Sequence, residues 1–341
     1  MTDTLLALFE RISTTLSDRF WAVIAYPTSS DHRLFWVYLM TSALFALFVY
    51  RKTWPRNGDN TPSFLAFLFP KKVWSNASAW LDLRFFVINE LTMKLIHIGL
   101  LAGTLAFTFQ LITGSNELVA FNWNEVLTIK GMSISLIYLI IAIAVGDFIG
   151  FFIHYLQHKI PFLWNFHKVH HSPEVMHPLS NFREHPVDNI AYGIGIGAGY
   201  GVLMGVVALV FGYVPRPPEV LGVPLFFFLF NVGGYHLRHS HVWLRWKGNW
   251  SKVFPSPAHH HVHHSCHPDH LDKNFAFMFP VWDVLFKTYH MPDDDRDVKF
   301  GLYGVEETEY TSVWKIYTLP FRDLWRKHVG VAGPAKEASK D

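Results

Sequence analysis

The sequence predicts an all-α fold, a polytopic membrane helical bundle of four to five spans with a cytoplasmic helical cap that carries a polyhistidine di-metal site. Three observations lead to this fold class. Half of the 341 residues are hydrophobic and only 16% are charged, whereas soluble domains carry about 25% charged residues. Several stretches are apolar on every side, unlike ordinary surface helices, which have a single apolar stripe. All but three of the 21 histidines lie between His154 and His290.

Four apolar runs are long enough to cross a bilayer, whose hydrocarbon core needs about 20 helical residues. They are residues 34–50, 95–113, 132–153 and 190–214. The fourth run has a glycine at every second position from Gly193 to Gly201, which permits close helix packing. A fifth run, residues 220–234, is shorter and interrupted by Gly and Pro, so it is a candidate for a tilted, half-spanning or re-entrant segment. A buried core helix is the alternative for any single run.

The distribution of Lys and Arg predicts how these spans are oriented. Loops rich in basic residues alternate with loops that hold almost none. Under the positive-inside rule, this alternation places residues 154–185 and all residues from 236 onward on the cytoplasmic side. The N-terminus has no basic segment before its apolar residues and carries Asp3 and Glu10, so a cleaved signal peptide is not expected.

Three regions follow from this pattern. Residues 1–92 hold an N-terminal interfacial segment, the first span and a basic loop. Residues 93–290 form the membrane and cytoplasmic domain with the histidine clusters, and residues 291–341 form a polar tail. Within the tail, residues 312–327 mix aromatic and basic side chains and predict a helix on the membrane surface, with a plain packing helix as the alternative. The net charge of +2 argues against a nucleic-acid partner, and the single cysteine, Cys266, excludes an intrachain disulfide and a Cys-rich metal site.

Three histidine clusters carry the chemistry. They are His154-x-x-x-His158, His167-x-x-His170-His171 and His260-x-x-His263-His264. Residues three or four apart share one face of a helix, so each cluster can present two or three imidazoles to one place. Eight imidazole nitrogens exceed the four ligands of a structural zinc ion and favour two metals in one cavity. Asp147 lies seven residues before the first cluster on the same helix face, where it could fix the tautomer of a ligating histidine.

The residues alone do not identify the metal, because neutral imidazole binds iron, copper, zinc and nickel. A loose metal-buffering loop is the alternative for residues 259–270. That alternative does not account for the second His-x-x-His-His pattern about 90 residues earlier, beside another membrane end.

Residues from about 147 to 288 resemble the fatty acid hydroxylase/sterol desaturase superfamily of membrane di-iron oxygenases. The resemblance rests on the three histidine clusters, which occur in this order after a membrane span. Shorter motifs support it: Arg183-x-His185-Pro186-x-Asp188, His239-Ser240, Asn274 and Trp282-Asp283-x-x-Phe286-x-Thr288.

This resemblance implies the roles of individual residues. Eight residues would be iron ligands and catalytic: His154, His158, His167, His170, His171, His260, His263 and His264. His185 and His239 would be further ligands or would support the ligands, and His241 competes with His239 for that role. Three residues would act from behind the ligands: Asp147, Asp188 and His236.

The resemblance also implies a reaction. Two Fe ions would activate O2, the co-substrate, for hydroxylation or desaturation of a membrane lipid, whether a sterol, a fatty acyl chain or a polar-lipid head group. Electrons would come from an external donor, either a reductase, a ferredoxin or a b-type cytochrome. The membrane would be a bacterial inner membrane or the endoplasmic reticulum. A zinc-dependent membrane lipid hydrolase is the first alternative, and a metal transporter or metal-buffering membrane protein is the second.

Overall fold

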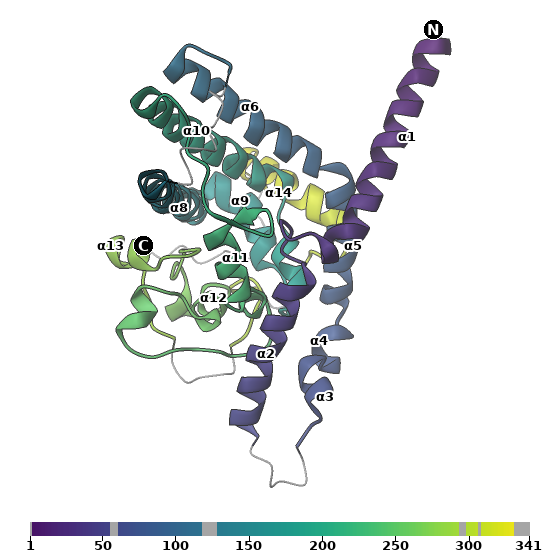
Figure 1. Ribbon diagram of the computed structural model, residues 1–341. Coiled ribbons are helices and arrows are strands. Elements are labelled where there is room, and N and C mark those ends of the chain that lie inside the picture. The colour runs from purple at the N-terminus through teal and green to yellow at the C-terminus, as the bar shows by residue number, and fades with distance from the viewer. Residues whose placement is uncertain (1, 55–60, 118–127, 293–297, 306–307, 331–341) are drawn as a thin grey trace.

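Three long helices form the membrane part of the molecule, α6 (Lys94–Thr113), α8 (Ile129–Lys159) and α10 (Pro186–Phe211). The computed structural model describes residues 2–54, 61–117, 128–292, 298–305 and 308–330. Within these ranges, the three helices are the ones long and apolar enough to cross a membrane. Helix α10 packs along α6 and also contacts α8 (Figure 1). Most of their side chains face away from the protein interior, as expected for helices surrounded by lipid.

The α6–α10 contact is close because α10 presents glycines to α6. A Cβ atom added to Gly197 would lie 2.5 Å from the carbonyl oxygen of Leu101, and one added to Gly201 would lie 2.5 Å from that of Leu105. Real Cβ atoms do not approach a backbone oxygen so closely, so the two backbones touch only where α10 has no side chain. The glycine pattern of the fourth apolar run therefore has the packing role that the sequence indicated.

Two of the five predicted spans differ in the structure. Residues 34–50 fall in α2 (Trp36–Thr53), which lies outside the set of three because Arg51 and Lys52 occupy its last turn. Residues 220–234 contain a two-stranded hairpin, β1 (Glu219–Val220) and β2 (Val223–Pro224), followed by the eight-residue helix α11 (Leu225–Val232). Eight residues give only about 12 Å of helix, too short for a bilayer core of about 30 Å.

The N-terminal region attaches to the rest through α5, which contacts η2 (Pro178–Phe182) and α14 (Val313–His328), and through α2, which contacts η3 (Tyr235–His239) and α11. Its remaining elements are α1 (Thr2–Ala25), η1 (Tyr26–Thr28), α3 (Phe64–Leu68), α4 (Lys71–Trp74) and α5 (Ala77–Thr92). Helix α1 projects beyond the body of the molecule (Figure 1) and contacts α5 near its own C-terminal end. There Arg19 donates to the backbone carbonyl of Glu90 at 3.1 Å and lies 3.6 Å from its carboxylate.

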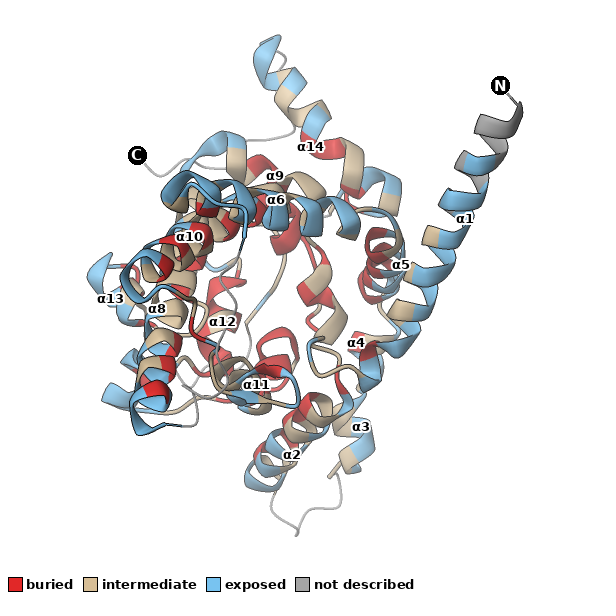
Figure 2. Cartoon of the chain, turned by 45° about the horizontal axis from the view of Figure 1, so that its top comes forward, coloured by how far each residue is buried: buried red, intermediate tan, exposed pale blue. Residues whose placement is uncertain are grey.

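The first histidine cluster lies in the last turns of α8, and the other two lie in a cap of short helices at the end of α8. This cap consists of α9 (Pro161–His171), η2 (Pro178–Phe182), η3 (Tyr235–His239), η4 (Asn249–Lys252), α12 (Pro257–His263), η5 (Pro268–His270) and α13 (Val281–Leu285). Helices α9 and α12 each begin with a proline at a first-turn position, where its fixed φ suits a helix start. Figure 2 shows buried residues concentrated on α9 and α12, whereas α1 and α6 are largely exposed.

A C-terminal helix, α14 (Val313–His328), forms where the sequence predicted one. Its inner face buries Ile316 and Leu319 against α5 and α9, in a cluster with Leu81 and Val169. Its outer face leaves large aromatic side chains exposed, including Trp314 and Trp325. The packing contacts fix the helix to the cap, and the exposed aromatic side is free to meet a membrane surface.

Candidate metal centre

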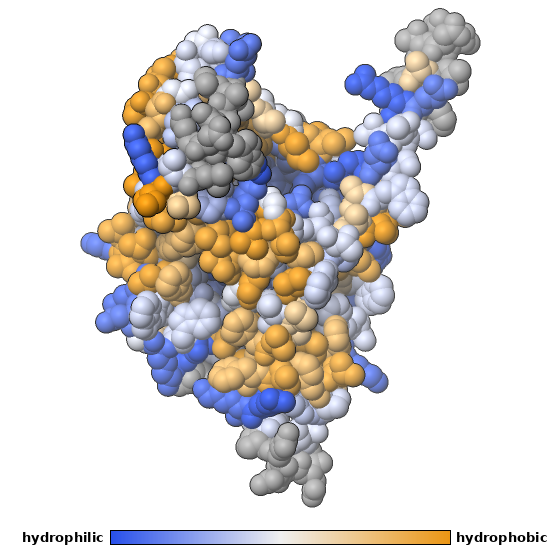
Figure 3. Space-filling model, viewed as in Figure 1, coloured by the Kyte–Doolittle hydropathy of each residue, from blue (hydrophilic) through white to orange (hydrophobic). Residues whose placement is uncertain are grey.

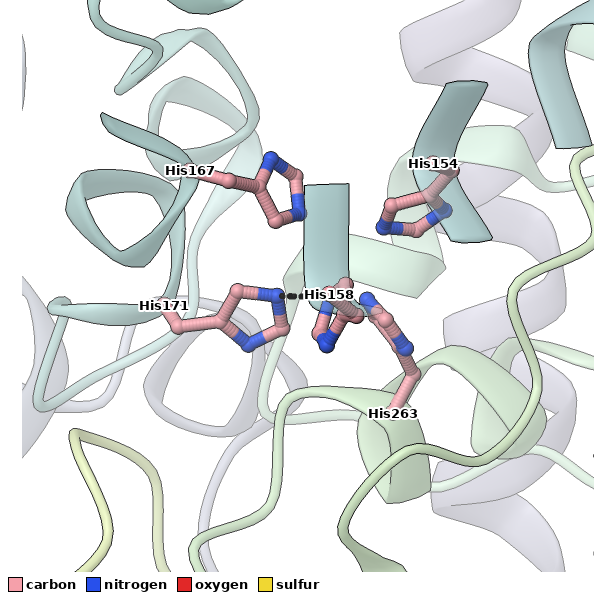
Figure 4. A group of neighbouring side chains, drawn as sticks. All are labelled: His154, His158, His167, His171 and His263. Atoms are coloured by element: carbon pink, nitrogen blue, oxygen red, sulfur yellow. Dashed lines mark hydrogen bonds between the residues drawn. The ribbon is translucent and has the colours of Figure 1, made fainter. Parts of the chain in front are cut away.

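Nine histidine side chains converge in two neighbouring groups. The first group is His154, His158, His167, His171 and His263, and the second is His170, His239, His260 and His264. In each group, one ring nitrogen of every histidine lies within 4.8 Å of those of the others. Figure 4 shows the first group, in which rings from α8, α9 and α12 face a common point.

Helical spacing explains how the clusters divide between the groups. In α9, His167 and His171 are four residues apart and join the first group, whereas His170 joins the second. In α12 and its C-cap, the pair four residues apart, His260 and His264, joins the second group, whereas His263 joins the first. Each His-x-x-His-His pattern therefore contributes to both groups, because its last two histidines are adjacent residues and point about 100° apart around the helix.

Hydrogen bonds behind the first group turn its ring nitrogens inward. The Nδ1 atoms of His154 and His263 lie 2.8 and 2.9 Å from the backbone carbonyl oxygens of Phe275 and Lys273. A carbonyl only accepts, so each Nδ1 carries the proton and each Nε2 keeps a free lone pair. These two Nε2 atoms, and that of His167, are buried without a hydrogen-bond partner. Buried unpaired nitrogens that face one another are the pattern of a metal site.

The second group shows the same arrangement. The Nδ1 atom of His239 is held at 3.0 Å by the hydroxyl of Ser180. The Nε2 atom of His260 lies 2.8 Å from that of His239 and 3.0 Å from that of His264. The Nδ1 atom of His170 is buried without a partner. The four ring nitrogens of the second group are thus close enough to one another to bind a single cation.

Burial keeps the rings of both groups neutral. It lowers the pKa of His263 to about 3, and it lowers the pKa values of His167, His171, His239, His260 and His264 well below their ordinary range. Because imidazole binds metals in its neutral form, the groups are ready to coordinate near pH 7. Nine nitrogens with no thiolate among them fit two metal ions of the kind that imidazole prefers.

Residues 139–288, which include every member of the two groups, match the family model described as fatty acid hydroxylase. This part of the chain is similar to fatty acid hydroxylase domains. The resemblance predicted from the histidine clusters is therefore confirmed.

Curated relatives are lipid-modifying enzymes. The chain is 27% identical to alkylglycerol monooxygenase of Caenorhabditis elegans, an alignment that covers 52% of this chain and 31% of that protein. It is 24% identical to the ornithine lipid hydroxylase OlsE of Rhizobium tropici, with 81% of this chain and 73% of that protein covered. The chain spans about a third of the length of the alkylglycerol monooxygenases it matches. No solved structure matches the chain.

Within residues 139–288, Asp188 lies directly behind a cluster histidine. Its Oδ2 atom is 2.8 Å from Nδ1 of His167, and its Oδ1 atom accepts a hydrogen bond from Nε2 of Gln157 at 2.6 Å. A carboxylate at this position fixes the ring orientation and increases the basicity of the opposite nitrogen. The sequence placed Asp188 in this supporting role, but it gave no indication of Gln157.

Four residues that the sequence suggested for the site lie elsewhere. His185 caps α10, with Nδ1 accepting from the backbone N–H of Val187 and Nε2 lying 3.2 Å from the carbonyl of Tyr317. It lies outside both histidine groups, and so does His236, whose Nε2 binds a backbone carbonyl. Within the described residues Asp147 makes no hydrogen bond to a histidine; it accepts from three N–H groups, the backbone ones of Met278 and Phe279 and the Trp282 indole. His241, the competitor of His239, likewise binds a backbone carbonyl, that of Phe67.

The tryptophan–aspartate motif supports the centre indirectly. Asp283 accepts hydrogen bonds from the backbone N–H groups of Phe275 and Ala276 at 2.8 and 2.9 Å. This fixes the segment whose Phe275 carbonyl holds His154. The sequence indicated the Trp282-Asp283 motif only through the family resemblance. Its contact with Phe275 and Ala276 forms only in the fold.

A cavity of about 440 Å³ reaches the first group from the cap side. Its lining includes the rings of His158, His171 and His263, and polar side chains that include Asp272 and Tyr303. Small polar molecules therefore have a route to the first group past the end of α8 and the segments of the cap.

Proposed function

We propose that this chain is a membrane-bound di-iron oxygenase that uses O2 and external electrons to hydroxylate or desaturate a lipid. The observation that carries the proposal is the pair of histidine groups, with five and four neutral nitrogens, inside a segment similar to fatty acid hydroxylase domains. Two iron ions held there would supply activation of O2 and attack on an unactivated C–H bond. Five nitrogens in one group exceed the needs of a four-coordinate zinc site, which argues against the zinc hydrolase.

The residues of the chain would bind, orient and shield this centre. Phe275 is almost fully buried, and its ring lies 4.8 Å from that of His158 and 5.5 Å from that of His154. An aromatic wall of this kind excludes water from the ligand side of the rings. The hydrogen bonds to backbone carbonyls and to Asp188 keep the ligand nitrogens aimed inward before a metal binds.

A membrane lipid is the substrate class that fits the location. The ligands His154 and His158 lie near the end of α8, so the centre adjoins the membrane helices. The two kinds of relatives, by their names, act on alkylglycerols and on an ornithine lipid, which favours a lipid with a polar head group. The electrons would come from a separate reductase, ferredoxin or b-type cytochrome, and the positive-inside pattern favours the cytoplasmic side for the centre.

Metal content of the full chain, purified in detergent, tests the proposal. Wild type should contain about two irons per chain after anaerobic reconstitution. His170→Ala should selectively weaken the metal of the second group and His171→Ala that of the first, because the two neighbours belong to different groups. His328→Ala is the matched control, because this exposed histidine lies in the last turn of α14, outside both groups.

One zinc per chain, with little iron even after reconstitution, would contradict the proposal and favour the hydrolase. An iron content that neither cluster substitution changes would contradict the assignment of the ligands.

A further inference from the structure

Arg238 is a buried cation that no carboxylate of the described residues neutralises. The residue is only 5% exposed, and its hydrogen bond goes to the backbone carbonyl of Phe277. Its guanidinium lies 4.9 Å from the ring centroid of Phe230 and 5.8 Å from that of Tyr235. Asp147 acts on it electrostatically but makes no ion pair with it, and is already occupied by three N–H donors.

The contrast with other buried basic side chains makes this arrangement informative. Arg183 is fully buried and pairs with Asp82, and Lys168 pairs with Asp323 at 2.9 Å. A buried charge without a counter-ion is costly, so such groups are generally paired or serve a ligand. Arg238 therefore offers a site for an anion.

A cavity of about 370 Å³ opens beside Arg238. It lies between α11, η3 and the segments at residues 246–257 and 278–279. None of its other lining residues carries a charge, and most are aromatic, glycine or proline. An apolar cavity with one buried cation suits a ligand that has one anionic group and an apolar remainder.

The mouth of this cavity borders exposed apolar side chains. Leu229 and Phe254, which line it, are 50% and 48% exposed, and the nearby Trp250 is 70% exposed. Figure 3 shows that apolar residues also form broad areas on the face drawn in Figure 1, where α2 packs against α11. A ligand could therefore enter from an apolar phase such as a bilayer.

Two residues of the cavity wall are close in the chain to members of the second histidine group, and Arg238 acts electrostatically on His239 and His260. Arg238 directly precedes His239 in η3, and Pro257, another lining residue, begins the helix that carries His260. A group bound at Arg238 is thus held beside the proposed metal centre. Atoms close to that anionic group would be the ones nearest to the second histidine group.

We propose that this cavity binds an acidic amphiphile, with its carboxylate or phosphate on Arg238 and its apolar chain running toward Leu229 and Phe254. The inference rests on the proposed function in that it names the substrate class of the oxygenase. The binding step itself requires neither iron nor turnover, so its failure and the failure of the oxygenase proposal can be told apart.

Equilibrium binding of three labelled probes to the detergent-purified chain tests the inference. The probes are oleate, oleyl phosphate and oleyl alcohol, which share one chain and differ in head group. Wild type should bind at least one of the two acids about tenfold more tightly than the alcohol, the effect of a hydrogen bond to a charged group. The acid whose affinity exceeds that of the alcohol by the larger factor shows whether the site prefers a carboxylate or a phosphate. The iron content of the same preparations tests the oxygenase proposal separately.

Variants locate the site. Arg238→Met should abolish the preference for the two acids without weakening the binding of oleyl alcohol. Arg238→Lys, which keeps the positive charge, should retain part of the preference for the acids. Met278→Trp places a larger side chain in the cavity and should weaken the binding of all three probes. This variant tests the cavity even if Arg238→Met does not fold. Lys252→Met removes an exposed charge in η4, a short helix next to the cavity's 253–257 wall, and should change nothing.

Equal affinity of wild type for acids and alcohol would overturn the inference. So would a preference that survives in Arg238→Met, or full binding of all three probes by Met278→Trp.

Discussion

Single side chains behind the two histidine groups determine which ring nitrogen His167 and His239 present. Asp188 holds His167 of the first group, whereas the hydroxyl of Ser180 holds His239 of the second. The two supports differ in chemistry, because one is a carboxylate and the other a neutral hydroxyl. Both are buried, so neither exchanges its histidine for water.

We predict that Asp188→Ala and Ser180→Ala weaken different metal ions. Loss of such a supporting partner typically reduces metal affinity by about 10–100-fold. Asp188→Ala should affect the ion of the first group and Ser180→Ala that of the second, with the carboxylate deletion having the larger effect. Metal titration of each purified variant, followed by the ion count per chain, measures this. The two variants serve as controls for each other, and an identical loss of both ions in both variants would contradict the division into two groups.

At the scale of whole elements, the contact between α6 and α10 depends on glycines that let the backbones touch. Gly201 lies against α6, so a methyl group there would meet both the Thr108 side chain and the backbone carbonyl of Leu105, which cannot move aside as a side chain can. Gly99, on α6 itself, has open space where its Cβ would be. Substituting Gly201 and Gly99 in turn therefore separates the effect of the α6–α10 contact from the effect of removing a helical glycine.

Gly201→Ala should destabilise the protein by about 1–3 kcal/mol, the usual effect of overpacking. Gly99→Ala should be neutral or slightly stabilising, since alanine favours the helical state by up to about 1 kcal/mol. The midpoint of thermal unfolding in detergent, compared with wild type, measures both changes. A Gly201→Ala midpoint equal to that of Gly99→Ala would argue against close α6–α10 contact.

The same scale shows what the sequence could and could not predict. The three longest apolar runs became α6, α8 and α10, and the three histidine clusters came together in the fold. Helix α11 is as apolar as a span, but a turn at Leu221 and Gly222, both with positive φ, interrupts its run. Hydropathy does not distinguish a short apolar helix from a spanning one, so the sequence leaves a tilted, half-spanning or re-entrant segment as the expectation here.

Supporting contacts were the hardest to predict. Ser180 and His239 are 59 positions apart, and Asp283 acts on His154 only through the segment it fixes. Asp147 has the helical spacing for a histidine partner, yet its carboxylate turns to loop N–H groups instead. Spacing along one helix shows which face a residue occupies, whereas its partner depends on which other segment packs against that face.

At the scale of the whole molecule, buried histidines outside the metal centre tie distant segments together. His32 stacks on Tyr26 at a centroid distance of 3.5 Å, and His185 binds the backbone of α14. Nε2 of His261 lies 2.9 Å from the carbonyl of Leu237, which joins α12 to η3. Each of these rings must stay neutral where it is, because burial disfavours its charged form.

We therefore predict that the metal-free protein loses stability as the pH falls below about 6.5. Burial lowers the pKa of His32 to about 3 and the pKa values of His185, His236 and His261 to about 4. In the unfolded chain these rings titrate near the ordinary histidine pKa of about 6.5. Between these values the unfolded state binds more protons than the folded state, so the free energy of unfolding decreases with falling pH.

Thermal unfolding of the chelator-treated chain in detergent, at pH values from 8 to 4.5, measures this dependence. The midpoint should be nearly constant above about pH 7 and should drop progressively below about pH 6.5. His185→Gln, which cannot titrate but can still donate to the carbonyl of Tyr317, should reduce the steepness of that drop. His328→Ala should leave it unchanged, because His328 is exposed at the end of α14. A midpoint that stays constant down to pH 5 would mean that these buried rings are already protonated in the folded protein or do not control its stability.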